Sequence, residues 1–283
     1  MSLQELNNHK LRSALSLMGI AFGIFCIIGV LSTVNSLESK VQNDVQKLGS
    51  NTIQISKWAF GGDDEYPWWK YVNRPVLKYE ELEFIKQRSS LTKYAAYFTA
   101  KGTSVEYKNT QLNNVGIYGV SEDFAKIELF DMVYGRYFSN TEFQRNLPVA
   151  VIGYSNAEQL FGKPERAVGK QITFDGKRAV VIGVIAKQGQ NFGPGFDYDY
   201  CVILPYFFYA SIYNVFSVDM DPFIMVNAND NIPSGALQDE LKGVMRQVRR
   251  LSPKQEDNFS LNSVEAFSKA ISDSFVTINI VGS

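Results

Sequence analysis

Histidine and cysteine are almost absent from this 283-residue sequence, which contains one histidine and two cysteines. His9 precedes a long apolar run, Cys26 lies within that run, and Cys201 lies far beyond it. The two cysteines are therefore not expected to pair, and the sequence after the run is long enough to fold without a disulfide. The same scarcity excludes a histidine-based zinc site or a Ser-His-Asp triad in that part of the chain.

Charge of either sign is missing from residues 13–37, although 20% of the whole chain is charged. We predict a transmembrane helix over residues 14–37, because about 20 apolar residues cross a hydrocarbon core of about 30 Å. Lys10 and Arg12 precede this run, so the positive-inside rule places residues 1–13 in the cytoplasm and the later residues outside. A signal peptide is the alternative, but its apolar core is usually only about 7–15 residues long and ends at a small-residue cleavage site.

Two small residues, Gly19 and Gly23, stand four positions apart in the predicted membrane helix. This small-x-x-x-small spacing lets a second helix approach closely. Glycine is also common in membrane helices generally, and the sequence favours neither interpretation over the other.

The residues after the membrane run continue the helical pattern and predict a stalk over residues 38–49. Apolar residues recur there at the helical period, so that one face of the helix stays apolar. Glycine commonly ends a helix, and one follows the last apolar position. The candidate coupling residues of this stalk are Leu37, Val41, Val45, Leu48 and Gly49.

The remaining sequence predicts an α+β fold in which two strand–helix–strand units flank a β-rich segment. Alternating apolar residues indicate strands and longer periodic stretches indicate helices. The two units are candidates for a structural repeat packed side by side. The first unit has a strand at 51–56, a loop at 58–75, a helix at 78–88 and strands at 94–99, 102–107 and 111–120; the second has a strand at 223–227, a helix at 234–251 and a strand at 258–263.

The segment between the units is mostly β. Its clearest feature is a hairpin over residues 169–184 that turns at Asp175-Gly176, since Asp-Gly is a strong hairpin signal. It also has short helices at 121–127 and 155–161 around a strand at 149–153. At the C-terminal end, residues 264–274 read as helix, and the apolar residues 275–282 are too few to span a bilayer. We expect a fragment that stops inside a second membrane helix.

The chemistry of an enzyme is missing from the sequence, and no cofactor or metal site is predicted. Residues 162–171 (GKPERAVGKQ) fail the spacing of a Walker phosphate loop and lack its final Ser or Thr. No arrangement of residues supports covalent catalysis. The net charge of −1 argues against nucleic acid as a partner.

Six stretches of the chain, in order, resemble signatures of the MacB family of ABC-transporter permeases, which is part of the FtsX-like permease group. No single stretch is decisive, and the resemblance rests on their shared order. They are NHKLRSALSLMGIAFGI at 8–24, LGSNTI at 48–53, GVSEDF at 119–124, GRYF at 135–138, VVIGV at 180–184 and LPY at 204–206.

The resemblance implies a fold and an organisation for the chain. Such permeases have four membrane helices, with an extracytoplasmic domain between the first and the second. That domain has a porter part made of two strand–helix–strand units, here 50–118 and 217–265, and an inserted β-rich sabre part, here 119–216. Residues 266–283 would then be a second stalk and the start of the second membrane helix.

The resemblance also implies a function and partners. The expected function is to couple cytoplasmic ATP hydrolysis to export of a substrate from the periplasm or the membrane, with the stalk as the coupling element. The expected location is the bacterial inner membrane. The expected partners are a separate cytoplasmic ABC ATPase subunit, a second permease as a homo- or heterodimer, a periplasmic adaptor and an outer-membrane channel. The alternatives are a lipoprotein-release or peptide-sensing permease of the same architecture, or a single-pass binding or scaffold protein.

Overall fold

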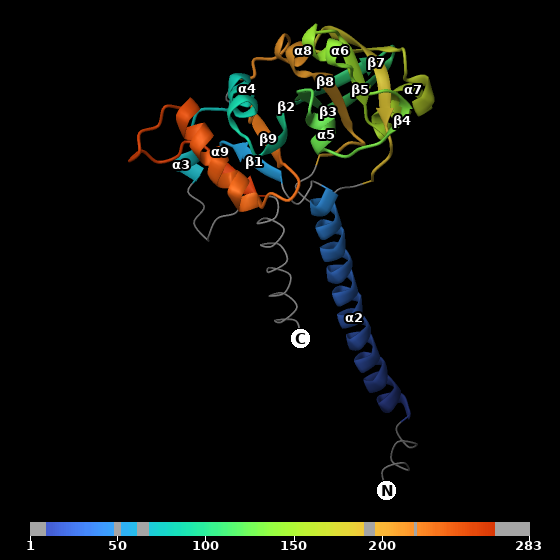
Figure 1. The fold of residues 1–283 in the computed structure, drawn as a ribbon. Coiled ribbons are helices and arrows are strands. Elements are labelled where there is room, and N and C mark those ends of the chain that lie inside the picture. Colours follow the sequence, from blue (N-terminus) through green and yellow to red (C-terminus); the bar gives the residue numbers. More distant parts are fainter. Residues whose placement is uncertain (1–9, 48–51, 61–67, 190–195, 218–219, 264–283) are drawn as a thin grey trace.

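The computed structural model describes residues 10–47, 52–60, 68–189, 196–217 and 220–263. Helix α2 (Lys10–Lys47) projects from a two-lobed α+β domain as a single rod (Figure 1). Its segment Ala14–Val34 has a mean hydropathy of 2.5, residues 14–30 of it are all exposed, and it is the one helix in the described chain long and apolar enough to cross a membrane. The predicted membrane helix and stalk are thus one uninterrupted helix as far as Lys47.

All ten strands of the described chain belong to one sheet. The order is β10-β1-β9-β2-β3-β8-β5-β7-β4, and β6 pairs with both β2 and β7. The strands are β1 (Thr52–Ser56), β2 (Thr92–Tyr107), β3 (Thr110–Val120), β4 (Met132–Gly135), β5 (Val149–Ile152), β6 (Gln171–Phe174), β7 (Lys177–Ile185), β8 (Cys201–Pro205), β9 (Phe223–Ala228) and β10 (Ser260–Ser263).

The helices of the domain are shorter than α2 and pack around this sheet (Figure 1). One of them corrects the prediction of a loop over 58–75, because helix α3 (Trp68–Val72) forms within that range. They are α3 (Trp68–Val72), α4 (Tyr79–Arg88), α5 (Phe124–Ile127), α6 (Asn140–Gln144), α7 (Tyr154–Phe161), α8 (Tyr206–Ala210) and α9 (Ser234–Val248), with a 3-10 helix at Pro164–Arg166.

One lobe, here called the open half, consists of β10, β1, β9 and the first part of β2, with helices α4 and α9. Every neighbouring strand pair in it is antiparallel. Strand β9 lies between β1 and β2, so the two strand–helix–strand units are interleaved. The prediction of two units packed side by side is therefore wrong. In this interleaved order, each unit has hydrogen-bond partners from the other unit. Hydrophobic periodicity within one segment does not reveal which strands will be neighbours.

The other lobe, here called the ring half, closes on itself. Its strands β2, β3, β8, β5, β7 and β6 form a ring, because β6 returns to pair with β2 at Val105↔Phe174. The predicted hairpin is confirmed: β6 and β7 are joined at Asp175 and Gly176, whose φ values of 45° and 71° are those of the tight turns that match strand twist. Strand β4 lies outside the ring, against β7.

Strand β2 belongs to both halves. Residues 92–98 pair with β9 in the open half, and residues 98–107 pair with β3 in the ring half. The prediction had two strands here, at 94–99 and 102–107, with a break before Gly102. Instead Gly102 pairs with Gly116 and the strand continues, with its irregularity between Thr103 and Val105. One continuous strand therefore connects the two halves.

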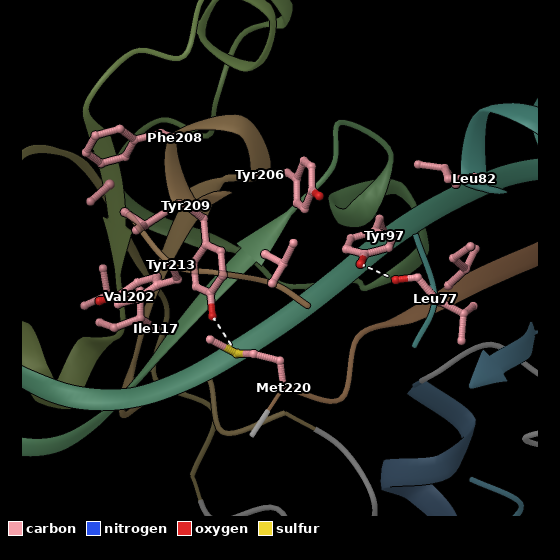
Figure 2. Packing of buried hydrophobic residues seen from close by; sticks show 14 of the residues in the cluster. Leu77, Leu82, Tyr97, Ile117, Val202, Tyr206, Phe208, Tyr209, Tyr213 and Met220 are labelled. Carbon is pink, nitrogen blue, oxygen red and sulfur yellow. Dashed lines mark hydrogen bonds between the residues drawn. The ribbon is translucent and has the colours of Figure 1, made fainter. Parts of the chain in front are cut away.

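The interior is built from branched aliphatic and aromatic side chains that come from both halves. Figure 2 shows this packing around β2, where the Tyr97 hydroxyl donates to the Leu77 carbonyl over 2.8 Å. The Tyr209 hydroxyl donates to the Met220 sulfur over 3.6 Å in the same view. These two buried hydroxyls are thereby satisfied within an apolar core. Gly119 lets Tyr209 approach, since a Cβ there would lie 2.5 Å from the Tyr209 Cγ.

The C-terminal predictions agree with the structure as far as it extends. The helix predicted over 234–251 is α9 (Ser234–Val248), and the strand predicted over 258–263 is β10 (Ser260–Ser263). The predicted helix at 264–274 and the apolar residues 275–282 lie outside the described residues.

Candidate functional site

The membrane-spanning part of α2 presents an open surface. Residues 14–30 are all exposed, so no other part of the described chain packs against them. A Cβ added at Gly19 or Gly23 would meet nothing within 4 Å. The structure places these two residues on the helix as predicted, and their role in helix packing stays a prediction. A surface of this kind can accept a second membrane helix.

The predicted coupling residues lie at the membrane-distal end of α2. Leu37, Val41 and Val45 are within its last turns, whereas Leu48 and Gly49 lie outside the described residues. The next element along the chain is β1, which occupies an interior position in the open half between β10 and β9. Beyond the undescribed residues 48–51, the chain therefore enters a strand that is hydrogen-bonded on both sides.

The ends of β1 and β10 lie side by side. Ile53 near the start of β1 pairs with Ser263 at the end of β10. The start of β1 and the end of β10 therefore lie at the same end of the sheet. Sequence reasoning did not find this juxtaposition, because the two residues are far apart in the chain.

Side-chain hydrogen bonds reinforce the other end of this strand pair. Asn262 is buried, and its amide donates to Ser56 Oγ and to the Trp58 carbonyl over 2.9 Å in each case. Its Oδ1 accepts the Phe60 N–H over 2.8 Å. Arg74 donates to Ser260 Oγ over 2.7 Å. These contacts tie β1, the chain after it and β10 into one unit.

Helices α4 and α9 are joined by a buried ion pair. The Arg249 guanidinium donates to both carboxylate oxygens of Glu81, over 2.7 and 3.2 Å, and the two side chains are 6% and 9% exposed. Glu240 on α9 accepts the N–H groups of Ser90 and Leu91 over 3.0 and 3.1 Å, just beyond the end of α4. Bidentate and charge-assisted bonds of this kind fix orientation as well as distance.

A cleft of about 320 Å³ lies between the open half and the ring half. One wall is α4, the opposite wall is α6 and the start of α8, and the residues that follow β3 lie at its base. The Tyr79 and Tyr206 rings stack across it, with centroids 4.3 Å apart and an angle of 11° between planes. The lining residues are Tyr79, Glu83, Ser121, Glu122, Phe143, Gln144, Tyr206 and Phe207.

The ring half contains a buried carboxyl group that sequence reasoning missed. Glu128 is 4% exposed, and the Tyr198 hydroxyl donates to its Oε2 over 2.8 Å. Its Oε1 has no hydrogen-bond partner in the described part of the chain. Burial raises the pKa of Glu128 to about 7, although the bond from Tyr198 acts in the opposite direction. The signal in the sequence that could have indicated this buried carboxyl group was one acidic residue within an apolar stretch, between Ile127 and Leu129-Phe130.

A second glutamate of the ring half has the opposite electrostatics. Arg136 donates to both oxygens of Glu142, over 2.7 and 2.8 Å, and the Ser139 N–H donates over 2.7 Å. The Arg136 bond, together with the bonds from Ser139, lowers the pKa of Glu142 to about 2. Gly135 in the same segment has φ 71°, and a Cβ there would lie 2.2 Å from the Ile182 carbonyl oxygen. The GRYF stretch at 135–138 therefore has a structural role, because Gly135 pairs with β7 and Arg136 binds Glu142 of α6.

Metal ligation has no visible basis in the residues that the structure describes. Nowhere among them do three or more His, Cys, Asp or Glu side chains gather closely enough to hold a metal ion. The polar clusters that do exist are occupied in hydrogen bonds between helices and strands.

The MacB-like periplasmic core domain family matches residues 13–244. This chain belongs to that family. It is 30% identical, over 68% of its length, to the macrolide export ATP-binding/permease protein MacB of Neisseria gonorrhoeae, and 25% identical, over 98% of its length, to the protein of the same name from Bdellovibrio bacteriovorus. It spans 29% and 42% of those relatives, respectively. The resemblance predicted from the six sequence stretches is confirmed.

The fold is also that of a solved MacB structure. The crystal structure of the periplasmic region of MacB from Actinobacillus actinomycetemcomitans superimposes with a TM-score of 0.64 at 17% identity, over 82% of this chain and 98% of that one. The predicted α+β fold with an N-terminal apolar helix is thereby confirmed. A MacB-like periplasmic core domain preceded by one apolar helix fits an inner-membrane protein whose main domain is periplasmic.

Proposed function

We propose that this MacB-like chain transmits force between a cytoplasmic ATPase and the periplasm, so that ATP hydrolysis drives export of a substrate from the periplasm or the membrane. The observation that carries the proposal is the unbroken course of α2 from its apolar segment to Lys47. A helix of 38 residues is about 57 Å long, of which the apolar segment accounts for about 32 Å. Residues 35–47 therefore extend about 20 Å beyond the membrane span.

The position of β1 supports a mechanical role for this extension. A displacement at the end of α2 reaches β1, which is hydrogen-bonded to β9 and β10 along its length. Ile53 and Ser263 are paired, so a second stalk after residue 263 would begin beside the end of the first. In this proposal the two stalks move together, and the interleaved sheet of the open half moves with them as one unit.

The topology and partners follow from the same proposal. Lys10 and Arg12 keep the N-terminal end of α2 in the cytoplasm, by the positive-inside rule. ATP is hydrolysed by an ABC ATPase outside residues 1–283. A second permease copy or a related permease packs on the face of Gly19 and Gly23, which is open in this structure. A periplasmic adaptor and an outer-membrane channel receive the exported substrate.

Proline substitutions in the stalk test the proposal. The double variant Val41→Pro/Val45→Pro interrupts α2 beyond the membrane, at a cost of about 3 kcal/mol for each interior proline. In the complete transporter reconstituted with its ATPase, this variant should hydrolyse ATP but export little or no substrate. Export and hydrolysis would be measured in the same proteoliposomes.

The matched control is Val41→Ala/Val45→Ala, which shortens the same side chains and keeps the helix. It should retain both hydrolysis and export. Normal export by the proline variant would contradict the proposal. Equal loss of export in both variants would assign the effect to the valine side chains and not to the continuity of the helix.

A further inference from the structure

The cleft between the two halves has walls that come from different parts of the fold. Tyr79 and Glu83 are on α4 of the open half, while Phe143 and Gln144 are on α6 of the ring half. A volume of about 320 Å³ is near the lower end of the range of about 300–1,000 Å³ that small-molecule sites occupy. The coupling proposal makes no use of this cleft.

Aromatic rings form much of the cleft surface. The Tyr79 ring stacks on Tyr206 and lies 5.0 Å from the Phe207 ring, centroid to centroid. Tyr97 packs edge-on against both tyrosines from beneath, at 5.6 and 4.9 Å, which fixes their orientation. Phe207 is 44% exposed, so its ring is accessible from the cleft. The cleft thus offers ring faces to a ligand.

Among the described residues that line the cleft, the charged ones are the carboxylates of Glu83 and Glu122. Glu122 shares Lys86 with Asp123, at 3.3 and 2.9 Å, so its charge is partly compensated. Glu83 has no cationic partner within ion-pair distance among the residues described here. Burial is the main cause that raises the pKa of Tyr79, and the charges of Glu83 and Glu122 raise it further. The Tyr79 ring therefore lies close enough to both carboxylates to be affected by their charge.

We propose that this cleft binds a small organic cation, namely an ammonium group that carries an aromatic or apolar body. The ammonium would lie against Glu83 and the face of the Tyr79 ring, where carboxylate attraction and cation–π attraction add. The apolar body would cover Phe207 and Phe143. A neutral analogue keeps only the apolar contacts, and an anionic analogue is repelled by both carboxylates.

Matched probes test this proposal on the whole chain in lipid nanodiscs. The probes are phenethylammonium, neutral 2-phenylethanol and anionic 3-phenylpropanoate, which share a phenyl group and differ in charge. Isothermal titration calorimetry at pH 7 and low salt should give binding for phenethylammonium, with affinity at least about tenfold higher than for either analogue. Partition into the lipid is subtracted with empty nanodiscs.

Two variants and one control locate the binding. Glu83→Gln removes the uncompensated charge at constant shape, and Phe207→Ala removes an exposed ring, so each should weaken phenethylammonium binding about tenfold. Glu158→Gln makes the same change on the exposed face of α7, outside the cleft, and should leave binding unchanged. All three side chains are exposed, so the variants should fold.

Two kinds of result would overturn the proposal. One is equal affinity for the three probes, or the same affinity in Glu83→Gln as in the unmodified chain. The other is binding of a basic peptide, acetyl-Phe-Arg-amide, much more tightly than phenethylammonium and with the same dependence on Glu83, which would assign the cleft to a side chain of a partner protein. Neither result depends on ATP or on transport, so it leaves the coupling proposal unaffected.

Discussion

The open half and the ring half are held together by different means. In the open half, charged side chains connect the helices, and the buried pair of Glu81 and Arg249 is the clearest example. In the ring half the strands close on one another, and Glu128, one of its buried carboxyl groups, receives only the Tyr198 hydroxyl. The ring half also has an ion pair, Arg136–Glu142, but its arginine is more than half exposed, whereas both partners of Glu81–Arg249 are buried. The open half therefore depends more on a buried charge pair, and the ring half more on closure and on close backbone packing.

Breaking the charge pair of the open half should have the largest effect on stability. Arg249→Met leaves the Glu81 carboxylate buried without its cation, so the free energy of unfolding should fall by about 3–5 kcal/mol. The measurement is urea unfolding of the chain in detergent, followed by circular dichroism. Hydrogen exchange should increase first in α4 and α9 and later in the ring half.

The matched control removes both charges. Glu81→Leu/Arg249→Met should recover most of the lost stability, because no buried charge is left alone. A loss below about 1 kcal/mol in Arg249→Met would show that water or another group compensates Glu81, and the contrast between the halves would then be wrong.

Close packing in the ring half is tested at Gly153, which precedes α7. A Cβ there would lie 2.2 Å from the Tyr198 carbonyl oxygen and 2.5 Å from that of Asp199, and neither backbone group can turn away easily. Gly153→Ala should therefore lower the free energy of unfolding by about 3 kcal/mol. Gly243→Ala on α9, where a Cβ meets nothing within 4 Å, should instead raise it by about 1 kcal/mol. Similar effects of the two substitutions would argue against the close contact.

The pH dependence of stability distinguishes Glu128 from a paired carboxylate. Its folded-state pKa of about 7 lies above its ordinary value of 4.5, so between these values the folded state holds a proton that the unfolded state has lost. Stability due to this group is therefore complete below about pH 4.5 and decreases as the pH rises to about 7. Glu128→Gln should remove this decrease, with a gain of roughly 1–3 kcal/mol at pH 8 and little change at pH 4.5. Parallel pH profiles for the two proteins would exclude a raised pKa.

A peripheral ion pair should have the smallest effect. Lys242 lies 3.6 Å from Asp257, and its side chain is more than half exposed. Lys242→Ala should change the free energy of unfolding by less than about 0.5 kcal/mol, because water stabilises each charge of an exposed ion pair almost as well as the partner charge does. A loss comparable to that of Arg249→Met would mean that the surface charges of α9 act as a network.

Local signals in the sequence predicted the individual elements well. The charge-free run gave α2, and Asp175-Gly176 gave the β6–β7 turn, because each depends on neighbouring residues. The interleaving of β9 between β1 and β2 was not predictable in this way, since hydrophobic periodicity fixes a strand's faces and not its neighbours. The same limit applies to β2, which was predicted as two strands at 94–99 and 102–107 and which pairing with β3, including Gly102 with Gly116, makes one continuous strand.

The candidate sites were less predictable than the fold. The helical period identified Val41 and Val45 as part of a continuous helix, and the structure contains that helix. The cleft was missed because Tyr79 and Tyr206 belong to different halves and meet only in the folded chain. Glu128 was missed because one carboxylate in an apolar stretch does not reveal whether it is buried or solvated.

The most direct test of the coupling proposal is a distance between two copies of α2 as a function of nucleotide. Gln42 would be changed to cysteine in a Cys26→Ser background, spin-labelled, and examined in the complete transporter by double electron–electron resonance. If α2 transmits force, the distance between the labels should shorten when ATP binds and lengthen after hydrolysis. An unchanged distance distribution in a transporter that still exports its substrate would contradict the proposal that α2 couples the two sides of the membrane.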